Sequence, residues 1–125
     1  MGASFSMCLF TGSVMRMCFF DSGSFENCDF SKSDLQFLSF AGSTIINCTF
    51  ENSELIHLNY NGANIIDTTF NNSNLYNSRF IKTCLISSDI VDCNVKKVFF
   101  INANLDGVSF KSSNTAEAVF QQEEM

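Results

Sequence analysis

A large apolar residue recurs at every fifth position of this chain, and this spacing limits the folds that the chain can adopt. The frame runs from Phe5 to Phe110 without insertion or deletion, and it has no exception between Phe30 and Phe80. On an α-helix, each step of five rotates the side chain by roughly 140°, so these residues would share no face. On a continuous strand, an odd spacing sends them to alternate faces. The repeat therefore predicts a solenoid of very short extended segments joined by corners.

We call every fifth residue a core position and the residue two before it a small position, because both are expected to face the interior. Between Cys28 and Ser78 the small positions carry Cys, Ser, Ala or Thr, apart from Leu38 and Leu58. After Phe10, aromatic residues occupy the core positions at multiples of ten, with the exception of Ile90. An even number of repeats in each coil would place rings on some sides and aliphatic residues on the others.

Four repeats match the unit of a known family, in which a small residue is followed by Asp or Asn, an apolar residue and two polar or turn residues. They are Ser33-Asp34-Leu35, Ala63-Asn64-Ile65, Ser73-Asn74-Leu75 and Ala103-Asn104-Leu105-Asp106-Gly107. On these units the chain resembles the pentapeptide-repeat proteins over about residues 3–112. The resemblance implies an all-β fold, a right-handed four-sided parallel β-helix of about five and a half coils. Residues twenty apart would then stack, and all core positions from Phe10 to Phe110 are expected to be buried.

The corners and the C-terminal end have their own signals. The second residue after a core position is often Gly or Asn, which tolerate positive φ; examples are Gly12, Gly42, Gly62, Gly107, Asn27, Asn47, Asn52, Asn72, Asn77 and Asn102. The frame breaks at Thr115, where Asn114 and Glu117 have the spacing of a helix capping box. We therefore predict a β-helix over residues 1–113 and a C-terminal capping helix and tail over residues 114–125.

Composition excludes several classes of function. The net charge of −6 argues against nucleic acid as a direct ligand, and no apolar run approaches the ~18 residues that span a bilayer. Five of the six cysteines occupy small positions, and none lies at zinc-ligand spacing from another. We predict six free thiols, no metal and no cofactor, with Cys84 alone pointing outward. Free thiols indicate a reducing compartment, which is the cytoplasm or, for a delivered effector, the host cell.

No residue pattern indicates catalysis. His57 is the one histidine and is expected at a solvated corner. Asp34 and Glu54 should stack on one face, but a prism filled by side chains offers no cleft that would shift the pKa of a carboxylate. No phosphate-binding glycine loop and no metal-binding motif occurs in the sequence. The chain is therefore predicted not to be an enzyme.

Two hypotheses of function remain. In the first, the chain is a passive protein-protein interaction module, of the kind that the family contributes to larger bacterial proteins, including effectors. In the second, the resemblance to topoisomerase-protecting members implies an acidic DNA mimic that binds gyrase. Up to Phe70 the chain has seven acidic residues against Arg16 and Lys32, and the candidate interaction residues for this role are Asp29, Asp34, Glu51 and Glu54.

Two apolar surfaces are candidates for contact with a protein partner. Ile46, Ile66 and Ile86 should form an exposed stripe on one face. Near the start of the chain, apolar residues occupy positions that should face solvent, and they are Met7, Leu9, Val14, Met17 and Phe19. The first coil also has open backbone edges. We therefore expect a homodimer through the N-terminal end, or contact with an upstream domain.

Overall fold

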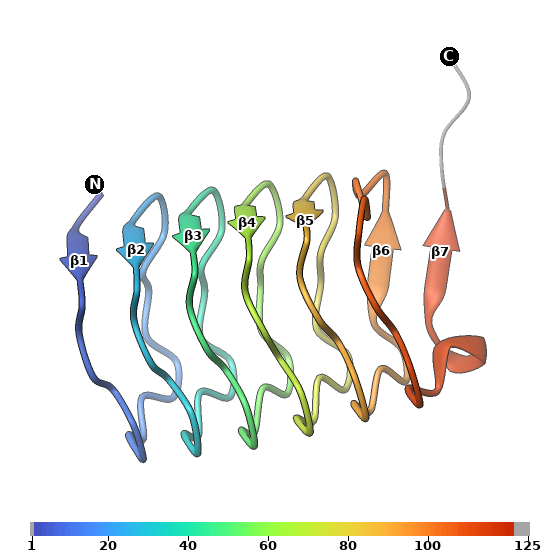
Figure 1. The fold of residues 1–125 in the computed structure, drawn as a ribbon, viewed down its shortest axis with the longest axis horizontal. Coiled ribbons are helices and arrows are strands. Elements are labelled where there is room, and N and C mark those ends of the chain that lie inside the picture. The colour runs from blue at the N-terminus through green and yellow to red at the C-terminus, as the bar shows by residue number, and fades with distance from the viewer. Residues whose placement is uncertain (1, 122–125) are drawn as a thin grey trace.

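Every coil of the chain lies in parallel register with the next one, twenty residues later. The computed structural model describes residues 2–121 and winds them into a solenoid of about six turns (Figure 1). Phe5 pairs with Phe25, Phe25 with Ile45, and Ile45 with Ile65. Along this face the strands form one five-stranded parallel sheet, which contains β1 (Ser4–Ser6), β2 (Ser24–Glu26), β3 (Thr44–Ile46), β4 (Asn64–Ile66) and β5 (Cys84–Ile86).

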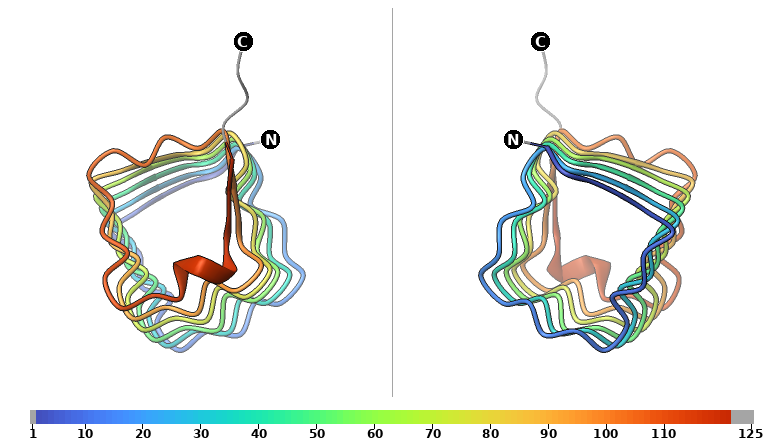
Figure 2. Two further views of the ribbon diagram at one scale, coloured as in Figure 1. Left: turned by 90° about the vertical axis from the view of Figure 1, so that its right-hand side faces the viewer. Right: turned by 90° about the vertical axis from the view of Figure 1, so that its left-hand side faces the viewer.

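Seen along its axis, the solenoid has four sides and winds in a right-handed sense (Figure 2). Single parallel bridges continue the same register on the other three faces, as between Asp34 and Glu54 or between Asn59 and Arg79. The predicted fold class, an all-β four-sided β-helix, is therefore confirmed. Its interior is enclosed by extended segments on every side, so core positions from all four faces meet there.

Two ladders of aromatic rings fill this interior. In one ladder Phe50 lies parallel to Phe30, with ring centroids 4.8 Å apart, and in the other Tyr60 stacks on Phe80 at 4.8 Å. The ladders meet edge to face, as where Phe40 contacts Phe50 at 5.6 Å and 82°. The core therefore consists of interlocked rings, with aliphatic side chains stacked on the two remaining faces.

Burial of the core positions is complete in the middle of the solenoid and incomplete at its ends. Core positions from Phe25 to Phe100 are buried, as expected. The prediction of burial from Phe10 to Phe110 is wrong for the terminal coils, where the half-buried core positions are Phe10, Met15, Phe20, Leu105 and Phe110. A coil at an end has only one neighbouring coil, so one side of its core residues is left uncovered.

The corners share one backbone conformation, whatever residue occupies them. Each second residue after a core position, from Met7 to Ser112, has φ between 51° and 72°. This confirms the corner role of the glycines and asparagines in these positions. Lys, Met, Phe37 and His57 adopt the same conformation, although side chains with a Cβ atom are disfavoured there.

Hydroxyl groups at the small positions connect neighbouring coils. Ser53 donates a hydrogen bond from its Oγ to the backbone oxygen of Phe30 (3.1 Å), and the same Oγ accepts one from the backbone N–H of Ser33 (3.2 Å). Ser73 bonds in the same way to Phe50 (2.6 Å) and Ser53 (3.1 Å). These side chains are buried, and their hydroxyl groups satisfy backbone groups at the corners.

The C-terminal end differs from the prediction of a capping helix. Only one 3₁₀ turn forms there, η1 (Thr115–Glu117), and it is followed by strand β7 (Val119–Gln121), which pairs in parallel with β6 (Phe99–Ile101). Asn114 does not cap a helix, because its Oδ1 accepts a hydrogen bond from the backbone N–H of Val95 (2.7 Å). Such a short helix is marginal in water, whereas β7 gains strand pairing and a ring stack. The predicted tail, residues 122–125, lies outside the described residues.

The six cysteines are all free, as predicted. Cys28 and Cys48 are buried on one face, and the Cys48 thiol donates to the backbone oxygen of Phe25 (3.4 Å). Burial raises the pKa of the Cys48 thiol to about 11, and that of the Cys93 thiol also to about 11. Cys84 lies at an outward position of β5 and is partly exposed.

Candidate functional site

The most exposed of the large apolar side chains in the described residues lie on the first coil, residues 4–20. We call this set the N-terminal collar; its members and their exposed fractions are Leu9 (81%), Phe19 (80%), Met7 (79%), Val14 (70%) and Met17 (69%). In the next coil the residues paired with Leu9, Val14 and Phe19 are Asp29, Asp34 and Ser39. The first coil thus carries apolar residues at outward positions where the second coil carries polar residues.

Beside the collar lies an open backbone edge. In the second coil, the backbone N–H groups of Asp29, Asp34 and Ser39 donate to carbonyl oxygens of the first coil. Within residues 2–121, the equivalent N–H groups of Leu9, Val14 and Phe19 have no partner. These three groups lie on three different faces, so the end of the solenoid offers a set of donors to whatever covers it.

The four acidic candidates are already engaged by neighbouring side chains. Asp34 forms an ion pair with Arg16, whose guanidinium lowers the pKa of that carboxyl. The pKa of Asp29 is lowered chiefly by a hydrogen bond from the Ser31 side chain. Glu51 accepts from the Thr69 hydroxyl at 3.2 Å, and Glu54 accepts from the Asn74 amide at 3.4 Å.

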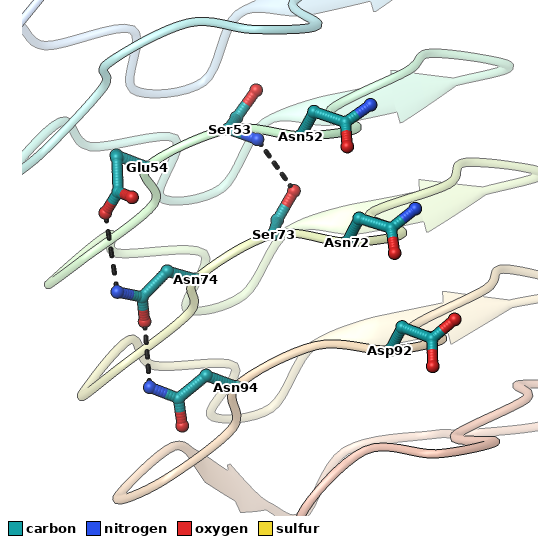
Figure 3. A pocket seen from close by; sticks show the side chains of 8 residues that line it. All are labelled: Asn52, Ser53, Glu54, Asn72, Ser73, Asn74, Asp92 and Asn94. Carbon is teal, nitrogen blue, oxygen red and sulfur yellow. Dashed lines mark hydrogen bonds between the residues drawn. The ribbon is translucent and has the colours of Figure 1, made fainter.

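A shallow polar groove of about 480 Å³ runs down one corner of the solenoid (Figure 3). One wall is the row of Glu54, Asn74 and Asn94, where each amide donates to the residue above it, at 3.4 and 3.0 Å. Asp92 belongs to the other wall, and Ser53 and Ser73 lie between the walls (Figure 3). The lining residues recur every twenty positions, so the groove is a regular product of the repeat.

The aliphatic stripe forms in the predicted register. Ile46 pairs with Ile66, and Ile66 pairs with Ile86, on strands β3, β4 and β5. All three side chains are half-buried, so the stripe is less exposed than the sequence suggested. Its neighbour on β2 is Glu26, which limits the apolar surface at that end.

A second hollow, of about 300 Å³, is lined by residues that the sequence analysis did not select. We call it the aromatic hollow; its lining residues are Phe37, His57, Asn77 and Arg79. Phe37 is 51% exposed and stacks on His57, with ring centroids 4.7 Å apart and planes at 13°. The Tyr76 ring lies edge-on to His57 at 6.0 Å. His57 is thus packed between rings, whereas the sequence predicted a solvated corner histidine.

The signal for this hollow was present in the sequence. Phe37 and His57 are twenty residues apart and occupy the same corner position, which often carries Gly or Asn in this chain. Stacking every twenty residues would have placed the two rings together. The residues of the aromatic hollow do not include an acidic side chain.

The described residues hold no cluster of three or more metal-ligating side chains. No helix between residues 2 and 121 has the length and apolar character needed to cross a bilayer. The candidate interaction surfaces are therefore the collar, the four acidic residues, the stripe and the aromatic hollow.

The fold defines a class of protein: a β-solenoid that is built from five-residue units and has a core of stacked aromatic rings. A family model described as the pentapeptide repeat region matches residues 43–120, which is more than half of the chain. The chain belongs to the pentapeptide-repeat family. A comparison with curated protein sequences finds no significant match.

Solved structures with a similar fold share little sequence with this chain. A trypsin-treated variant of QnrB1, a plasmid-mediated fluoroquinolone resistance protein, aligns with a TM-score of 0.57 and 13% identity, over 95% of this chain and 78% of that chain. A pentapeptide repeat protein from the thylakoid lumen of Arabidopsis thaliana aligns with a TM-score of 0.48 and 18% identity, over 87% and 66% of the two chains. At 13% identity the similarity to the QnrB1 variant shows the fold alone.

Proposed function

We propose that this chain is a non-enzymatic protein-protein interaction module that docks through its N-terminal collar. The observation that carries the proposal is the exposure of Leu9 and Phe19, each about four-fifths uncovered on the first coil. Apolar side chains as exposed as these favour a partner that removes them from water. The filled interior supports a role without catalysis, because the rings leave no room for a substrate.

The partner that fits this end best is a second copy of the chain. A twin first coil would supply backbone groups to the N–H groups of Leu9, Val14 and Phe19, and it would continue the outward rows in which they stand. A two-fold axis closes such a contact after two copies, so no fibre grows from it. In a longer polypeptide, a preceding coil or domain would occupy the same surface.

The same architecture suits one part of a larger bacterial protein, including an effector delivered into a host cell. The six free thiols are compatible with a reducing compartment, either the cytoplasm of the producing cell or that of a host. The solenoid would then serve as a rigid spacer with a docking end.

Light scattering over a concentration series tests the proposal. The test variant is Leu9→Thr, Met17→Asn and Phe19→Ser, which introduces residues that occupy the same rows elsewhere, at Thr49, Asn77 and Ser39. We expect a dimer for the unchanged chain and a monomer for the variant. A matched control replaces Ile46, Ile66 and Ile86 with Thr and should remain dimeric. A monomer before substitution, or an unchanged dimer after it, would contradict the proposal.

The second candidate is an acidic DNA mimic that binds gyrase. Its support is the excess of acidic residues in the first four coils, together with the fold shared with a fluoroquinolone resistance protein. Arg16 already neutralises Asp34, so the role would fall to Asp29, Glu51 and Glu54. A gyrase supercoiling assay tests it: the chain should change the supercoiling activity, and Asp29→Asn, Glu51→Gln and Glu54→Gln together should abolish that effect.

A further inference from the structure

The aromatic hollow combines two features that the stability of the fold does not explain. Phe37 and His57 have φ of 63° and 59°, at corner positions where Gly or Asn would adopt the conformation more easily. Phe37 also keeps half of its surface in water and belongs to no core cluster. Its stack on His57 is worth only about 1 kcal/mol. Every corner shares this φ, so what sets these two corners apart is the pair of stacked rings that they carry.

Hydrogen-bond donors converge on this hollow. The Asn77 Nδ2 lies 2.9 Å from the His57 Nδ1. Because Nδ2 can only donate, the neutral ring carries its proton on Nε2 and presents a second donor. The Arg79 guanidinium has no side-chain partner among the described residues, and Arg79 is exposed. Lys97 is the next residue in the corner row, after Asn77.

The charge here is opposite to that of the whole chain. The net charge is −6, yet the lining of the hollow has a guanidinium and no carboxylate. A planar guanidinium beside an amide and an imidazole N–H suits a carboxylate, which accepts several hydrogen bonds at once. The exposed surface of Phe37, which also lines the hollow, suits an apolar side chain next to that carboxylate.

We propose that the aromatic hollow binds an acidic peptide segment of a partner protein, with a carboxylate on Arg79 and the neighbouring apolar side chain on Phe37. The inference rests on the proposed role as an interaction module and adds the chemistry of the partner. The hollow lies one coil beyond the collar. Met17 of the collar and Phe37 of the hollow are successive residues of the same corner row. The collar and the hollow are adjacent but share no residue, so different substitutions test them.

The test uses the single histidine of the chain as a reporter. Because His57 is the one histidine, its imidazole C–H signals in a proton NMR spectrum belong to the hollow without further assignment. The unchanged protein is titrated with a blocked tetrapeptide, Gly-Phe-Asp-Gly. We expect a saturable shift of these signals. The matched peptides Gly-Phe-Asn-Gly and Gly-Ala-Asp-Gly should each bind at least about tenfold more weakly.

Two variants and a control locate the contact. Arg79→Gln and Phe37→Asn should each weaken binding of the Asp peptide about tenfold or more, and Asn fits the corner conformation, so the fold is preserved. The control is Lys82→Gln, which removes an exposed cation from a different corner and should leave the affinity unchanged. Absence of a saturable shift, equal binding of the Asp and Asn peptides, or an unchanged affinity in Arg79→Gln would overturn the proposal. Light scattering is independent of these readings, so failure of the dimer and failure of the hollow are distinguishable.

Discussion

The two ends of the solenoid differ in whether a further segment covers them. At the C-terminal end, β7 pairs with β6, Phe120 stacks on Phe100 at 4.9 Å, and η1 lies across the end of the last coil (Figure 2). At the N-terminal end, Leu9 and Phe19 are exposed and their backbone N–H groups have no partner within residues 2–121. Both ends use the same repeat, so the difference arises from β7 and η1, which cover the last coil only. An end coil without a cover presents exposed apolar side chains and backbone donors, which is why we propose the N-terminal end for docking.

The largest expected effect compares one ring position in the middle with its equivalent at the open end. Phe50→Ala removes a fully buried ring from between Phe30 and Phe70 and should cost about 3–5 kcal/mol of unfolding free energy. In the monomeric background of Leu9→Thr, Met17→Asn and Phe19→Ser, Phe10→Ala should cost about half as much, because Phe10 is then stacked on one side only. Urea denaturation of both substitutions in that background measures the difference. Equal losses there would contradict the account of an open first coil.

Removal of the C-terminal closure should make the two ends alike. A chain that stops before Asn114 lacks β7 and exposes Phe100 and Phe110, which contact Phe120 at 4.9 and 5.6 Å. With both ends open, association need not stop at two copies, and we expect larger assemblies. Light scattering and electron microscopy of the shortened chain would detect them. A particle no larger than the dimer would contradict this account of the closure.

The period of five was sufficient to predict a solenoid, because neither a helix nor a continuous strand gives Phe30, Leu35 and Phe40 a common interior. The four sides and the right-handed sense came from the resemblance to the pentapeptide-repeat family. The C-terminal end was mispredicted because Asn114 and Glu117 have local helix signals. A non-local interaction outweighs those signals, because Phe120 lies twenty residues after Phe100 and stacks on its ring. Local propensity is weak where strand pairing is available.

The candidate sites were predicted less completely than the fold. The collar residues, such as Leu9 and Phe19, were found because apolar side chains at outward positions conflict with the repeat. Phe37 and His57 were not selected, because neither is unusual until the twenty-residue stack places them in contact at 4.7 Å. The partial burial of Ile66 was also not expected. It arises because Ile46 and Ile86 on the two adjacent strands cover Ile66.

A tyrosine hydroxyl on a core ring should lower the unfolding free energy in the middle of the solenoid and have little effect on it at the open end. The Tyr60 hydroxyl is buried among rings and is the one buried side-chain polar atom of the described residues without a hydrogen-bond partner. Tyr60→Phe should therefore raise the unfolding free energy by about 1–3 kcal/mol. The control, Phe20→Tyr, places a hydroxyl on a half-buried ring of the same ladder and should change stability by less than about 0.5 kcal/mol. A destabilised Tyr60→Phe would reveal an unseen partner of the hydroxyl.

The smallest effect concerns the thiols and alkaline pH. Burial raises the pKa of Cys48 and of Cys93 to about 11, above the ordinary value of 9.0. The folded state therefore holds these protons more tightly than the unfolded state, so their contribution is complete below pH 9.0 and is lost as the pH rises toward about 11. Urea denaturation at pH 8 and pH 10.5 measures the loss. Cys48→Ser and Cys93→Ser together should reduce this pH dependence, and an unchanged dependence would exclude the thiols as its cause.

Small-angle X-ray scattering tests the central claim, that the open end is the docking end, most directly. A dimer joined through the two first coils should have about twice the length of the monomer and an unchanged cross-section. The Leu9→Thr, Met17→Asn and Phe19→Ser variant provides the monomer for comparison. A particle of monomer length, or a dimer that is thicker rather than longer, would contradict the claim, because the copies would then be separate or would associate side by side.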